Sequence, residues 1–300
     1  MLTSDGVRRR FVPAGLLVLV LVLGLGGCDN ALPMRPVLLE PASGAQLDTD
    51  TPVFTVQNAL GYDGGEAQYT FRVAVAASDR EVATLTAPAG SGKTSVRFPF
   101  ALLRGAELAW SVVARRSTGE LVESDRATFR LPSLVCPSPR DPYAKAVTEW
   151  WVPASCLAVN RYNDPQAVLG PPDAGGAGPD SFFGFLSLGD SGWVSVDMEA
   201  CAVNGPAGDV RVFQAVSFEP VTLYASSGPT GPWVLVGYRQ VCQQRQPGTV
   251  SRYCDFDLDE AGLDETRYLR VEDGELYPCP GDTTSEGADL DAVQIVNLKP

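Results

Sequence analysis

Short segments with alternating apolar and polar side chains recur along most of this chain. In the first half they are clearest at Val53–Val56, Tyr69–Val75, Trp110–Ala114 and Ala127–Leu131. A period of two residues indicates half-buried β-strands. Clusters of Gly, Pro, Ser and Asp separate these segments, at spacings that suit a β-sandwich.

The second half has the same pattern. Its strand candidates are Gly192–Val196, Asp209–Phe213, Val221–Ala225, Trp233–Val236 and Arg267–Val271. The one helical candidate, around Tyr143–Trp151, ends against a proline and fits a strand equally well. We therefore predict an all-β protein with two β-sandwich domains.

A proline-rich stretch divides the two halves. Leu131-Pro132-Ser133 is followed by Cys136-Pro137-Ser138-Pro139, which is too rich in proline to continue a sheet. All cysteines beyond the N-terminal region lie within or after this stretch. The predicted organisation is a signal peptide at 1–27, a tether at 28–35, a first sandwich at 36–132, a linker at 133–139 and a second sandwich at 140–300.

The N-terminus has the order of a signal peptide. Arg8–Arg10 precede an apolar run, Gly15–Leu25, that is too short to span a bilayer as a helix. Its end, Leu25-Gly26-Gly27-Cys28, resembles the bacterial lipobox. The resemblance implies that Cys28 is acylated, with palmitate as a typical chain, and anchors the protein on the exported side of the inner or the outer membrane of a bacterial envelope. The alternative is an ordinary signal peptide with a cysteine near its cleavage site.

The other six cysteines form an even set, which suits three disulfides in an oxidising compartment. Six cysteines allow fifteen pairings, and the sequence does not choose among them. Local loop closure favours Cys242 with Cys254 and Cys136 with Cys156, which leaves Cys201 with Cys279.

The charge is strongly negative, at −13, and most of it lies after residue 132. Such a surface repels phosphate backbones, so nucleic acid is excluded as a partner. Excess carboxylates also favour a bound cation. Acidity that only keeps the protein soluble is the alternative.

The first half resembles fibronectin type III and related immunoglobulin-like modules of bacterial surface proteins. Pro41–Ala45 corresponds to the opening turn, Thr51–Phe54 to the second strand, and Leu102–Ala114 to a later strand whose Trp110 belongs to the core. The resemblance implies a spacer or a protein-binding module.

The second half resembles bacterial cell-surface modules with a galactose-binding-like jelly roll. The ordered motifs include Tyr143–Val147, Asn163–Asp173, Phe256–Leu263 and Ala288–Val293. The chain departs from the family at Gln214, where glutamate is usual. Such jelly rolls often hold a structural calcium ion between loops, which implies a calcium site here as well.

Calcium takes six to eight oxygen ligands, and aspartates recur at the predicted strand ends. On a strand, the side chains of Asp289 and Asp291 point to one side, where a cation would relieve their repulsion. The alternative is a set of surface aspartates at turns. The candidate ligands are Asp173, Asp209, Asp273, Asp289 and Asp291.

The chain contains no histidine and therefore lacks the commonest general base. We predict a non-catalytic binding or adhesion module for a glycan or polymer. Trp150 and Trp151 are the favoured stacking pair, with Trp193, Trp233 and Tyr277 as further aromatic platforms. One alternative is a structural component that binds another envelope protein. The other is a glycoside hydrolase that uses a carboxylate pair.

Overall fold

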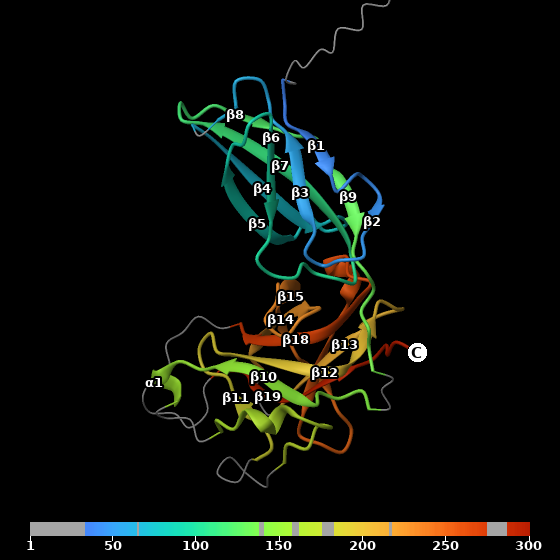
Figure 1. Cartoon of the computed structure of the whole chain (residues 1–300). Coiled ribbons are helices and arrows are strands. Elements are labelled where there is room, and N and C mark those ends of the chain that lie inside the picture. Colours follow the sequence, from blue (N-terminus) through green and yellow to red (C-terminus); the bar gives the residue numbers. More distant parts are fainter. Residues whose placement is uncertain are drawn as a thin grey trace, which may run out of the picture. The chain divides into compact units, whose positions relative to one another are not determined.

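The computed structural model describes residues 34–64, 66–137, 141–157, 162–175, 183–215, 218–274 and 287–300. Cys28, the predicted signal peptide, Tyr277 and Cys279 lie outside these residues. Nearly every regular element is a β-strand (Figure 1). The exceptions are α1 (Ala154–Leu157) and the 3-10 turns η1 (Pro165–Val168) and η3 (Leu258–Ala261). The prediction of an all-β protein is confirmed.

Two sheets make up the first half of the chain. Strands β1, β3 and β6 form an antiparallel three-stranded sheet, while the larger sheet has the order β2-β9-β7-β4-β5, with β8 added beside β7. The strands are β1 (Val37–Glu40), β2 (Ala45–Gln46), β3 (Val53–Gln57), β4 (Ala67–Val75), β5 (Glu81–Pro88), β6 (Lys93–Arg97), β7 (Glu107–Arg116), β8 (Leu121–Glu123) and β9 (Ala127–Arg130).

Aromatic side chains join these two sheets. Phe54 of β3 lies 5.1 Å from Trp110 of β7 and 5.6 Å from Phe129 of β9, measured between ring centroids in edge-to-face geometry. Trp110 is 1% exposed, and its indole Nε1 donates to the carbonyl of Pro41 at 3.1 Å. Edge-to-face pairs add about 0.5–1.5 kcal/mol to the burial of their area. The prediction that Trp110 belongs to the core is confirmed.

Two further antiparallel sheets, each of five strands, follow residue 140. Their orders are β10-β12-β18-β14-β15 and β11-β19-β13-β17-β16. The strands are β10 (Ala146–Trp151), β11 (Leu186–Ser187), β12 (Trp193–Val203), β13 (Val210–Gln214), β14 (Pro220–Ser226), β15 (Val234–Val241), β16 (Gln244–Arg245), β17 (Arg252–Phe256), β18 (Glu265–Asp273) and β19 (Asp289–Ile295).

The strand candidates of the sequence coincide with β3, β4, β7, β9, β12, β13, β14, β15 and β18. The ambiguous segment ending at Trp151 is a strand, β10. No strand before residue 131 pairs with one after residue 140 within the described ranges. The described part of the chain also contains no helix long and apolar enough to cross a bilayer. The domain boundaries themselves stay a prediction.

The disulfides correct part of the local pairing hypothesis. Cys242 pairs with Cys254, as proposed from their short loop. Cys136, however, pairs with Cys201, with 5.7 Å between their Cα atoms, and not with Cys156. The prediction that Cys201 pairs with Cys279 is therefore wrong as well. The long strand β12 carries Cys201 beside Cys136, although 65 residues separate them in sequence. Cys156 is also disulfide-bonded.

Candidate functional site

Four of the five aspartates proposed as calcium ligands, Asp209, Asp273, Asp289 and Asp291, accept hydrogen bonds from loops and neighbouring strands. Asp209, which is fully buried, accepts from the amides of Gly205 at 2.9 Å and Leu258 at 2.8 Å, and from Asn297 Nδ2 at 2.7 Å. Asp273 accepts from the amide of Ala288 at 3.0 Å. A buried carboxylate requires such donors, because it has lost its water.

Asp289 and Asp291 have separate partners. Ser187 Oγ donates to Asp289 at 2.6 Å, whereas Asp291 accepts from Ser251 Oγ and from the amide of Asp173 at 3.0 Å. Burial raises the pKa of Asp291, although these hydrogen bonds oppose the rise. Hydroxyl and amide donors thus occupy the carboxylates that the sequence analysis assigned to a cation.

Among the described residues, no group of three or more acidic or cysteine side chains could hold a metal ion. The calcium site therefore stays a prediction from the sequence. Asp209, Asp273, Asp289 and Asp291 are buried, so the alternative of surface aspartates does not describe them, and their hydrogen bonds indicate a structural role. Glycine, proline and serine near these positions indicate loops in the sequence. Because loops leave backbone amides without strand partners, these residues could have predicted that the aspartates accept hydrogen bonds.

Trp150 and Trp151 end β10, the edge strand of the β10-β12-β18-β14-β15 sheet. They are 36% and 49% exposed. Trp151 lies opposite Trp193 of β12, while Trp150 lies opposite the buried Val194. Neighbours directly opposite each other share a face, so the two tryptophans point to different faces. Only Trp151 belongs to the outer face that carries Trp193.

The register of the five strands places polar and aromatic residues together on that outer face. Ser195 lies opposite both Glu149 and Arg270, and Arg270 lies opposite Tyr224. The inward positions on these strands, such as Val194, Val196, Leu223, Leu269 and Val271, are fully buried. We refer to Glu149, Trp151, Trp193, Tyr224, Trp233, Arg270 and Glu272 as the aromatic face.

Arg270 lies at the centre of the aromatic face. Its guanidinium carbon is 3.8 Å from the Trp193 ring centroid and 4.5 Å from that of Trp233. Arg270 Nε donates to Ser195 Oγ at 2.8 Å, and Nη2 donates to Glu149 Oε2 at 3.3 Å. Burial lowers the pKa of Arg270, with the carboxylates of Glu149 and Glu272 opposing. Each indole contact contributes about 0.5–2 kcal/mol, depending on desolvation.

Further charges are paired around this centre. Arg267 donates to both carboxylate oxygens of Asp197, at 2.8 and 2.7 Å, and this pairing raises the pKa of Arg267. Burial, followed by the nearby carboxylate of Glu272, raises the pKa of Tyr224. These paired groups hold their positions before any ligand arrives, which lowers the entropy cost of binding.

This arrangement can bind a hydroxyl-rich ligand. The exposed indole of Trp151 offers an apolar plane, while Glu149, Arg270 and Glu272 offer hydrogen-bond acceptors and donors in the same layer. Aromatic planes with a few convergent polar groups are the usual composition of small-molecule sites. Sequence reasoning identified the tryptophans but missed Arg270 and Glu149, because only strand pairing brings residues 149, 193, 233 and 270 together.

No family model matches this chain, and no curated protein matches it. Among solved structures, a SusE-like protein is similar at 12% identity and a TM-score of 0.27, over 86% of this chain and 94% of that one. Latent PorU from Porphyromonas gingivalis shares 14% identity, with a TM-score of 0.22, over 90% and 21% of the two chains. The FN1–FN3 domains of chicken CNTN1 share 11%, with a TM-score of 0.20, over 85% and 68%.

Proposed function

We propose that this chain is a non-catalytic lipoprotein of a bacterial envelope, anchored through Cys28, that binds a glycan through the aromatic face. The observation that carries the proposal is the stack of Arg270 between Trp193 and Trp233, with the exposed Trp151 beside it. The lipobox-like Leu25–Cys28 supports the anchor.

Non-catalytic action is part of the proposal. A carboxylate acid in glycoside hydrolysis needs a raised pKa and access to the sugar. Burial raises the pKa of Asp291, but this side chain is 1% exposed and hydrogen-bonded to Ser251. A panel of polysaccharides incubated with the protein should release no reducing ends. Turnover that is lost in Glu149→Gln would contradict this part of the proposal.

A glycan array, followed by calorimetry on the best glycan, tests the binding itself. Trp151→Ala should weaken binding at least about tenfold, since losing a stacking plane costs about 1.4 kcal/mol or more. Phe100→Ala removes an aromatic of similar exposure, 44%, from the first half and should leave affinity unchanged. An array without any glycan signal would contradict glycan binding and favour an envelope protein as the partner.

A further inference from the structure

The first sandwich begins close to the proposed anchor. Cys28 and Met34, the first described residue, are six residues apart, and an extended chain spans at most about 3.6 Å per residue. If Cys28 carries the acyl chains, the start of the sandwich stays within about 20 Å of the bilayer. Its orientation there depends on which side chains lie near this end.

The β3–β4, β5–β6 and β7–β8 loops lie together at the end of the sandwich where β1 begins. Val37, at the start of β1, lies opposite Gln57, at the end of β3, and Gln57 lies opposite Lys93, at the start of β6. In the other sheet, the end of β7 at Arg116 lies opposite the start of β4. Figure 1 shows β1, β6 and β8 at this end of the sandwich.

Large apolar side chains are exposed on these loops. Met34 is 77% exposed, Leu60 in the β3–β4 loop is 54% exposed, and Leu121 at the start of β8 is 61% exposed. Arg116 holds the two leucine-bearing loops together. Its Nε donates to the carbonyl of Gly61 at 2.8 Å, and its Nη1 donates to Glu120 Oε2 at 2.6 Å.

Gly61 makes this contact feasible, because its φ is +74° and a Cβ there would lie 2.0 Å from Arg116 Nη2. The hydrogen bond from Arg116 to Gly61 therefore holds the backbone next to Leu60 in place. Met34, Leu60 and Leu121 all lie at this end, and exposed apolar side chains that gather on one part of a soluble domain mark an interaction surface.

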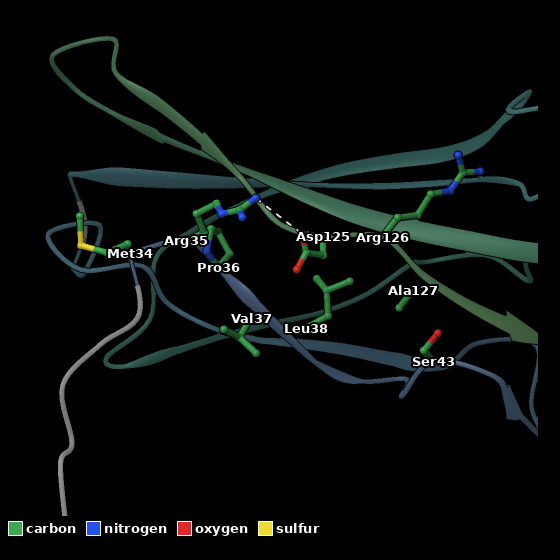
Figure 2. A pocket seen from close by; sticks show the side chains of 9 residues that line it. All are labelled: Met34, Arg35, Pro36, Val37, Leu38, Ser43, Asp125, Arg126 and Ala127. Atoms are coloured by element: carbon green, nitrogen blue, oxygen red, sulfur yellow. Dashed lines mark ion pairs between the residues drawn. The ribbon is translucent and has the colours of Figure 1, made fainter.

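A hollow of about 430 Å³ continues this surface along β1. Figure 2 shows Met34, Val37 and Leu38 beside it and Arg35 reaching toward Asp125, at 3.5 Å between Nη1 and Oδ1. Arg35 and Arg116 are both paired with carboxylates, of Asp125 and Glu120, which lowers the net charge at this end. Such a surface fits zwitterionic lipid headgroups and the upper acyl region.

We propose that the end of the first sandwich bearing Met34, Leu60 and Leu121, the lipid-facing end, rests on the bilayer in which Cys28 is anchored. The inference depends on the anchor proposed above. It implies that the chain is held in one orientation and does not swing freely on its tether.

The test uses the full lipidated chain in phosphatidylcholine vesicles containing a headgroup nitroxide lipid. An environment-sensitive dye is attached to Leu60→Cys or Leu121→Cys, and to Phe100→Cys as the matched control. Phe100 is 44% exposed and follows β6 at the opposite end of that strand. We expect strong quenching at positions 60 and 121 and at least about threefold less at 100.

Equal quenching at all three positions, or none at 60 and 121, would overturn the lipid-facing end. Adding Leu60→Asp to the Leu121→Cys protein should reduce quenching without moving the melting temperature, because Leu60 is exposed. Co-flotation with vesicles is measured on the same samples. A chain that does not float refutes the anchor and the inference together, whereas one that floats without quenching refutes the inference alone.

Discussion

The guanidinium of Arg270 stacks 3.8 Å above the ring centre of Trp193, although 77 positions separate the two residues in the printed sequence. Strands β12 and β18 bring them together, and Trp233 lies on the guanidinium as well, at 4.5 Å. The contact is therefore a product of sheet pairing, and it makes Arg270 the centre of the aromatic face.

Replacing Arg270 tests the role of this stack. Arg270→Lys keeps the charge but loses the planar group that fits between two indoles, so we expect the free energy of unfolding to fall by about 1–2 kcal/mol. Urea unfolding measures the change. The exposed Arg245→Lys, on β16, is the control and should change little. A stability loss of the same size in both variants would contradict a special role for the stack.

Replacing Cys28 tests the anchor. Cys28→Ser removes the acyl acceptor, so the protein should move from the membrane fraction to the soluble exported fraction. Fractionation with detection of the mature chain measures this shift, and mass spectrometry of the native chain should show two added acyl chains or more. A native mature chain that carries no acyl group would refute the lipid anchor.

Removing each disulfide tests their unequal contributions. The Cys136–Cys201 bond closes a separation of 65 residues and Cys242–Cys254 one of 12. In the chain-entropy model the longer loop contributes about 4 kcal/mol and the shorter about 3 kcal/mol. The paired serine variants, compared by urea unfolding, should therefore lose more stability at Cys136–Cys201. The reverse order would show that loop length does not govern these bonds.

The buried Asp291 predicts a pH effect. Burial raises its pKa in the folded protein, so folding carries a cost when the carboxyl is ionised, and this cost disappears as the pH falls through the folded pKa. Asp291→Asn can still accept from the amides of Asp173 and Ala174. The unfolding free energy of the variant relative to the native chain should increase as the pH rises above about 4, the pKa of an unfolded aspartate. A difference in unfolding free energy that does not change with pH would contradict the raised pKa of Asp291.

A melting curve decides the calcium hypothesis. A ligand that binds only the native state raises the melting temperature. A rise with calcium that chelator reverses and Asp289→Asn abolishes would support the site predicted from the sequence. We expect an unchanged melting temperature, because Asp209 and Asp289 already accept hydrogen bonds from Gly205 and Ser187. That result would assign these carboxylates a structural role in holding loops.

The sequence alone determined the all-β class and the positions of nine of the nineteen described strands, because a period of two in hydrophobicity follows directly from strand geometry. It also determined the anchor hypothesis at Cys28, since the lipobox-like residues are contiguous. The disulfide Cys242–Cys254 could be predicted because only 12 positions separate the two cysteines, so that a short loop brings them together.

Only the tertiary structure decided which distant residues meet. Strand order and register set the pairing of Cys136 with Cys201 and the stack of Arg270 on Trp193. It also placed backbone amides and a hydroxyl beside Asp209, Asp273 and Asp289, since a carboxylate's partners depend on which donors the fold leaves beside it. Local pattern determines which side chains a strand buries, whereas non-local pairing determines what those side chains contact.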